Sequence, residues 1–173
     1  MDRVDEILAQ WARERPGLDV GPMGPIGRVL RLSRHLMRAL EGTLARHGLS
    51  FASFDVLATL RRSAPRDGLS PSALMAAMMV TSGTTTHRID QLEAQGLVER
   101  QPNPDDQRSV IVLLSPRGRA LIDAALEDYV ACQAELMRAL PKTERATLSS
   151  LLRTWLGALE GPTEAPTART KRL

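Results

Sequence analysis

The chain has 173 residues, a length that suits one domain with additional arms and excludes two large independent domains. Aromatic residues make up 3% of it against 43% apolar residues in total, so a core must be built mainly from aliphatic side chains, which favours helices. The formal net charge is +3, but residues 26–119 sum to +5 whereas residues 1–25 and 120–160 each sum to −2. A basic middle between acidic ends fits a module that binds a polyanion.

The sequence carries no sign of export. Cys132 is the single cysteine, so no intrachain disulfide is possible. The first residues include Asp2 and Asp5, which give the wrong charge for a signal peptide, and no apolar run reaches the length of a membrane span. We therefore expect a cytoplasmic protein with no membrane partner.

Two helices are predicted in the first part of the chain. Residues 1–15 place apolar side chains at helical spacing, which predicts a short added helix that must dock on another element. Residues 16–25 hold three prolines and three glycines and predict a linker. Apolar residues then recur at three- and four-residue steps over residues 26–48, which predicts a long helix ended by Gly48.

The following segments predict a helix-turn-helix. A helix over residues 53–63 precedes Ser70-Pro71, which is an N-cap followed by proline at the first helical position. Another helix begins near Ser82 and ends at Gly96, where a C-cap is expected. The few residues MMVTSG join these two helices, and this short connection makes them a helix-turn-helix candidate.

The periodicity changes after this second helix. Residues 97–98 and 110–114 predict two strands around a polar, charged loop, which is a β-hairpin. Ser115-Pro116 repeats the N-cap signal and opens a long helix that Pro141 ends, and a last helix is expected over residues 143–159. Residues 161–173 predict a disordered tail.

The first and last long helices have no evident partner for their apolar faces within the chain. We therefore predict that residues 26–48 and 116–160 supply the helices of a dimerisation lobe. The alternative is a single compact helical bundle.

The helix that begins near Ser82 has one face suited to DNA. If Ile89 faces the core, a turn of about 100° per residue places Thr84, His87 and Gln91 on the opposite side. Backbone amides at Ser82 can meet a phosphate, and Arg108 in the hairpin loop can reach a minor groove or phosphates. The alternative is a polar, solvated helix face. The predicted DNA-contacting residues are Ser82, Thr84, Thr86, His87, Gln91 and Arg108.

The run VTSGTTTHRIDQLEAQGLVERQPNPDDQRSVIVLLSPRGRAL resembles the signature of the MarR family, in which a recognition helix precedes a D-x-R-S wing. The resemblance implies a mostly α (α+β) fold, a winged helix-turn-helix with a helical dimerisation lobe over residues 26–160, and a DNA-binding part at residues 53–115. It implies a repressor that binds an inverted-repeat operator in double-stranded DNA as a homodimer. The wing motif maps to Asp106, expected to support the wing, and to Arg108, expected to meet DNA.

A second resemblance narrows the function. The segments QWARERPGLDVGPMGPIGRVLRLSRHL and SFDVLATLRR are similar to the PecS, HucR and TamR subgroup, whose members carry an added N-terminal helix with a tryptophan and respond to small metabolite anions such as urate or aconitate. Carried over by position, this resemblance implies a ligand set with no further cofactor. The implied ligand residues are Trp11, Asp55, Arg88 and Arg100.

Three points about these residues stay open. Instead of binding a ligand, Asp55 could simply face water. Trp11 could only pack the added helix onto the core. His87 stands where many subgroup members have asparagine, and DQRSV replaces the commoner DRRGV, so base preference and effector do not follow from the subgroup.

Other functions fit less well. An oxidant sensor would need a reactive thiol, but Cys132 lies in an apolar stripe, where a buried thiol is usually inert. The three histidines are scattered, and no nucleophile elbow, phosphate loop or metal-binding spacing is present, which argues against an enzyme and a metal site. A winged helix used only for protein contacts predicts no salt-dependent affinity for DNA.

Overall fold

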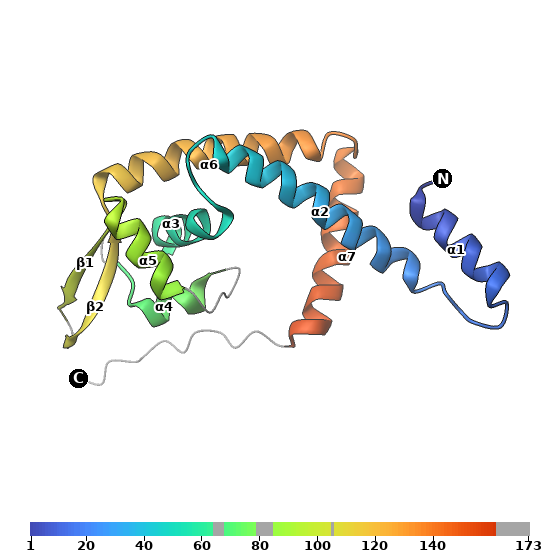
Figure 1. Ribbon diagram of the computed structural model, residues 1–173, viewed down its shortest axis with the longest axis horizontal. Coiled ribbons are helices and arrows are strands. Elements are labelled where there is room, and N and C mark those ends of the chain that lie inside the picture. The colour runs from blue at the N-terminus through green and yellow to red at the C-terminus, as the bar shows by residue number, and fades with distance from the viewer. Residues whose placement is uncertain (64–67, 79–84, 105, 162–173) are drawn as a thin grey trace. The chain divides into compact units, whose positions relative to one another are not determined.

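A computed structural model describes residues 1–63, 68–78, 85–104 and 106–161, and the chain divides into two compact units, residues 1–133 and 134–173. Figure 1 labels the elements. In chain order they are α1 (Arg3–Glu14), α2 (Met23–Ala45), α3 (Phe51–Ser63), α4 (Pro71–Ala77), α5 (Thr85–Ala94), β1 (Val98–Asn103), β2 (Asp106–Leu114), α6 (Pro116–Leu136) and α7 (Lys142–Glu160).

The core of the first unit lies where α3, α4 and α5 pack together beside the β1–β2 hairpin (Figure 1). Each of these helices turns its apolar stripe inward, so that Leu60, Leu74 and Ile89 are fully buried. The hairpin closes one side of this core through Val98 and Val112, and Leu69 forms a further antiparallel bridge to Val112. The predicted mostly helical, winged helix-turn-helix fold is therefore confirmed.

Local signals define several helix ends as the sequence predicts. The Ser70 hydroxyl accepts a hydrogen bond from the amide of Ala73, which caps α4 ahead of Pro71. After α5, Gly96 takes a positive φ of 66°, and the amides of Gly96 and Leu97 donate to carbonyls in the last turn. This pattern is a Schellman motif, which requires a left-handed residue and so favours glycine.

The hydroxyl of Ser115 joins the hairpin to α6. It donates to the carbonyl oxygen of Gly96 at 2.7 Å and accepts from the amide of Gly118 at 2.9 Å. One side chain therefore caps the N-terminus of α6 and anchors that helix to the end of α5.

Two predicted boundaries differ from the structure. Helix α2 begins at Met23, inside residues 16–25, which were expected to be a linker. Proline is tolerated in a first helical turn because the amide that it lacks has no intrahelical acceptor there, so Pro25 does not delay the helix. The strands also extend further than predicted, because most of the expected loop residues pair in the hairpin.

Helix α1 docks on the N-terminal half of α2. Val4 is buried against Gly27, and the guanidinium of Arg28 pairs with the carboxylates of Asp2, at 2.9 Å, and Asp5. The pKa of each carboxyl lies below its ordinary value, first because it accepts a backbone amide of the capping box and also because Arg28 is adjacent. A lowered pKa means that this contribution to docking is present near neutral pH and is lost as the pH falls through the lowered value.

Among the described helices, none is long and apolar enough to cross a bilayer.

Candidate nucleic-acid interface and effector site

Helix α5 buries one face and exposes the other. Ile89 and Leu92 are buried in the core, whereas His87 and Gln91 are exposed, as the helical wheel predicts, and Thr86 is exposed as well. Ser82 and Thr84, which belong to the predicted DNA-contacting set, lie outside the described residues.

The exposed face of α5 carries a chain of side-chain hydrogen bonds. The Nη1 atom of Arg88 donates to Oε1 of Gln91 at 3.4 Å, and Nε2 of Gln91 contacts Nε2 of His87 at 3.0 Å. Arg88 Nη1 also donates to the hydroxyl of Ser50, just before α3, at 3.4 Å. Both acceptors that the described residues offer Arg88 are therefore neutral oxygens at long hydrogen-bond distances.

Arg88 is unusual because part of its charged group is buried without a partner. Its Nε atom is inaccessible to solvent and has no hydrogen-bond partner among the described residues, and the described part of the chain offers Arg88 no ion pair. An unsatisfied buried donor costs about 1–3 kcal/mol, and more when the group is charged.

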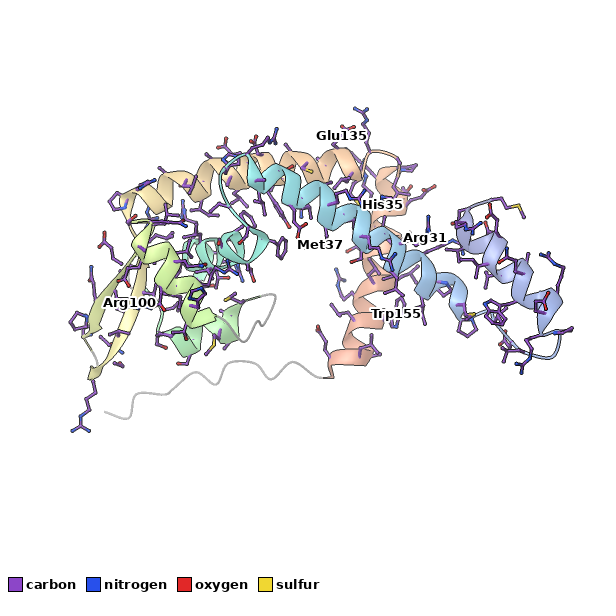
Figure 2. All side chains as sticks on the ribbon, viewed as in Figure 1. Arg31, His35, Met37, Arg100, Glu135 and Trp155 are labelled. Atoms are coloured by element: carbon purple, nitrogen blue, oxygen red, sulfur yellow. The ribbon has the colours of Figure 1, made fainter. Side chains whose placement is uncertain are left out.

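Arg100, in contrast to Arg88, pairs with carboxylates. From β1 it pairs with the carboxylates of Asp90, at 2.5 Å, and Glu93 on α5, and Figure 2 shows it between these elements. The hydrogen bond with Asp90 contributes most to raising the pKa of Arg100, and the charge of Glu93 raises it further. The structure thus ties this predicted ligand residue to two acids that sequence reasoning missed. Their spacing of three residues on α5 was the only available signal.

The other two predicted ligand residues lie elsewhere. Asp55 is 5% exposed on α3, so the alternative that it faces water is wrong. Burial raises the pKa of Tyr129 on α6, and the negative charge of Asp55 raises it further. Trp11 is 41% exposed on α1, and Figure 1 shows α1 and α5 well apart within the first unit. One chain therefore does not bring Trp11 next to Arg88.

The hairpin presents a basic residue, Arg108, on strand β2 and not in the loop where the sequence predicted it, because the strands extend into that segment. Asn103 Nδ2 donates to the hydroxyl of Ser109 at 2.9 Å across the two strands. Arg108 is exposed beside this contact. The backbone of Asp106 opens β2, but its side chain lies outside the described part, so its role in supporting the wing stays a prediction.

Side-chain contacts to two aspartates join α6 to the preceding helices. Arg61 of α3 donates to Asp123 at 2.7 Å, and His47 after α2 contacts Asp128 at 2.9 Å. Cys132, one turn further along α6, is half-buried. Across the residues that the structure describes, no cluster of three histidine, cysteine or acidic side chains is suited to hold a metal ion.

Comparison with known proteins agrees with this geometry. The sequence model of the MarR family matches residues 47–109, which span α3, α4, α5 and most of the hairpin. The HTH-type transcriptional regulator PecS of Dickeya dadantii is 39% identical over 149 residues, which cover 86% of this chain and 90% of PecS. The chain belongs to the MarR family.

Solved structures of MarR-family proteins show the same fold. A variant of MarR from Escherichia coli in complex with operator DNA matches with a TM-score of 0.68 and 30% identity, over 80% of this chain and 99% of that one. BpsR of Bordetella bronchiseptica, whose DNA binding is regulated by 6-hydroxynicotinic acid, matches with a TM-score of 0.67 and 26% identity, over 76% and 92% of the two chains. As a MarR-family member, the chain is a transcriptional regulator and its relatives are regulators rather than enzymes.

Proposed function

We propose that the chain forms a homodimer that binds an inverted-repeat operator in double-stranded DNA and represses transcription until a small metabolite anion releases it. The observation that carries this proposal is the exposed face of α5, where His87 and Gln91 lie opposite buried Ile89, beside a hairpin with exposed Arg108. A helix of this kind fits a major groove, and a basic hairpin next to it fits the adjacent minor groove or phosphates. The operator complex of the E. coli relative supports this mode of binding.

The dimer is supported by apolar side chains that the second unit leaves exposed on α7. A helix with such a surface requires a partner, and a second copy of the chain supplies one by symmetry. We assign dimerisation to residues 26–48 and 116–160, and DNA binding to residues 53–115. The exposed large apolar residues of α7 are Leu151, Leu152, Trp155, Leu156 and Leu159.

The effector is proposed to bind at Arg88, with Trp11, Asp55 and Arg100 as the remaining members of the set that the subgroup resemblance implies. Arg88 supports this proposal best, because its guanidinium has a buried Nε with no partner among the described residues and contacts only neutral oxygens among them. Hydrogen bonds that Arg88 donates to an anion would join two opposite charges and would be shorter than these contacts. The regulation of BpsR by an organic acid is consistent with an acidic effector.

Operator binding is tested with two substitutions on the proposed DNA-contacting surface. His87→Ala is expected to weaken binding about tenfold, because a side chain that hydrogen-bonds to a base edge contributes about 1–3 kcal/mol. Arg108→Ala is expected to weaken binding by a similar factor and to reduce the slope of log affinity against log salt by about one unit. Gel-shift titrations with a duplex from the protein's own upstream region measure both effects.

Arg13→Ala is the matched control, because it removes an exposed arginine of α1 that lies outside the residues assigned to dimerisation and DNA binding. It should leave the affinity within about twofold. A duplex with only one half-site should bind far more weakly than the full repeat if the chain acts as a dimer. Unchanged affinity in both His87→Ala and Arg108→Ala would contradict the assignment of this surface.

The effector proposal is tested by direct calorimetry without DNA. Arg88→Met is expected to weaken the binding of urate, xanthine or aconitate at least tenfold, because it removes the charged fork but keeps an apolar stem. Arg34→Met, which changes an exposed arginine of α2 that has no ion pair among the described residues, should bind the same anion as tightly as the unsubstituted chain. Equal binding by Arg88→Met would show that the anion binds elsewhere.

A further inference from the structure

Hydrogen-bonding chemistry orients the side-chain contacts on α5 in one direction. An arginine only donates, so the Gln91 atom that faces Arg88 must be its carbonyl oxygen, as the structure has it. The amide nitrogen of Gln91 therefore faces His87 and must donate to Nε2 of that ring, which accepts only when the ring carries its proton on Nδ1. The tautomer of the His87 ring is thus linked, through Gln91, to the position of Arg88.

Helical spacing makes Gln91 the only bridge between these two side chains in the described structure. Arg88 and His87 are adjacent in sequence, so their side chains point about 100° apart and do not face each other. Gln91 follows them at three and four residues, which places it on the helix surface between the two. Both of its polar atoms are used in the contacts with Arg88 and His87.

We propose that Gln91 is a relay that couples an anion bound at Arg88 to the base-reading side chain of His87. This inference rests on the proposed function, because it assumes that the anion binds at Arg88 and that α5 reads the operator. It adds a role for Gln91 in regulation, beyond contact with DNA.

The strengths of the contacts give the relay its direction. The bond from Arg88 to Gln91 is long, at 3.4 Å, and joins a charged donor to a neutral oxygen. A carboxylate or urate anion adds a negative charge to the acceptor, which shortens and strengthens the bond, so the anion replaces Gln91 as the acceptor. Arg100 does not switch in this way, because Asp90 and Glu93 already supply it with two carboxylates.

Release of Gln91 from Arg88 changes the orientation of the side chains that α5 presents to the operator. Recognition of a base edge by glutamine requires a fixed amide that presents its oxygen and nitrogen together. Once Arg88 has left, the amide is free to rotate, and the ring of His87 loses the donor that selects its tautomer. The two base-reading side chains thus lose their orientation together.

The first test compares the anion response of two glutamine variants. Gln91→Met removes both hydrogen bonds but keeps the length of the side chain, and Gln95→Met makes the same change one turn later, outside the relay. Operator affinity is measured with and without saturating urate, xanthine or aconitate, and binding of the anion is measured separately by calorimetry. We expect the anion to reduce operator affinity at least tenfold in the unsubstituted chain and in Gln95→Met, but less than about threefold in Gln91→Met, although that variant still binds the anion.

The outcomes separate the relay from the proposed function. If the unsubstituted chain binds none of the three anions, the effector proposal is wrong and the relay with it. If the anion binds and weakens operator affinity equally in Gln91→Met, the relay alone is wrong.

A second measurement needs neither operator nor anion. It tests the relay even if Gln91→Met binds the operator too weakly for its affinities with and without the anion to be compared. At a pH where imidazole rings are neutral, ring ¹⁵N shifts of His87 in the free chain should show mainly the tautomer protonated on Nδ1. Arg88→Met, which frees Gln91, should lower the share of this tautomer, and Arg34→Met should leave it unchanged. A His87 ring that does not respond to Arg88→Met would overturn the relay.

Discussion

Replacing Gly118 with alanine is expected to lower the free energy of unfolding by about 3 kcal/mol, the upper end of the usual cost of overpacking. A Cβ atom at this position would lie 1.9 Å from the carbonyl oxygen of Leu97. That carbonyl accepts the amide of Ser115 at 3.1 Å, so it cannot retreat without breaking the connection between the hairpin and α6. The clash is with backbone, and no side-chain rotation relieves it.

Urea unfolding measures this loss and should be followed at several protein concentrations, because the apparent stability of a dimer depends on concentration. Gly42→Ala is the matched control, since a Cβ at that α2 position meets no atom within 4 Å. Alanine there should stabilise the chain by about 0.5–1 kcal/mol, because glycine is a poor helix former. A loss of less than about 1 kcal/mol in Gly118→Ala would contradict the rigid connection inferred here.

The features that the sequence predicts best depend on local chemistry. The apolar stripe of α5 identifies Ile89 as a core residue, because helical periodicity alone decides which face is apolar. Ser70 and Ser115 act as N-caps for the same reason, since a cap needs only its own side chain and the next three amides. Gly96 takes the left-handed conformation that a C-cap requires.

Features that depend on context are harder to predict. The proline- and glycine-rich residues 16–25 suggest a linker, yet α2 begins inside them because Pro25 occupies a first turn. The polar composition of the hairpin loop hides the strand pairing of Pro102 with Val110, which is set by the register of the whole hairpin. Composition reports neither of these constraints.

Contacts between elements are the least accessible from sequence. Arg100 lies 7 residues from Glu93 and 10 from Asp90, across the turn that ends α5. Whether Arg100 points toward these acids or toward a ligand depends on how the hairpin packs on α5, and one sequence does not specify that packing. The resemblance supplied a ligand role for Arg100, and the structure adds its pairing with the two acids.

Replacing Arg100 with glutamine is expected to weaken operator binding about 50-fold, more than the loss of any single proposed DNA contact. Truncating one member of a hydrogen-bonded charge pair leaves the other members uncompensated, which commonly costs several kcal/mol when the pair is buried and less when it is partly exposed. Arg100 is 26% exposed, so an intermediate cost is expected. The substitution releases the hairpin from α5, and it also leaves Asp90 and Glu93 as unpaired negative charges beside the proposed DNA surface.

Two variants separate this role from general destabilisation. Arg61→Gln breaks a comparable pair, with Asp123 at 2.7 Å, where the pKa of the arginine is likewise raised by its carboxylate partner. It should leave operator affinity within about threefold, because this pair joins α3 to α6 and not the proposed DNA-contacting elements. Arg100→Lys should bind with intermediate affinity, since an ammonium keeps the charge but lacks the fork that reaches two carboxylates. If Arg100→Gln loses no more affinity than Arg61→Gln, the pairing of β1 with α5 does not position the DNA-binding surface, and Arg100 would then act only in the effector set.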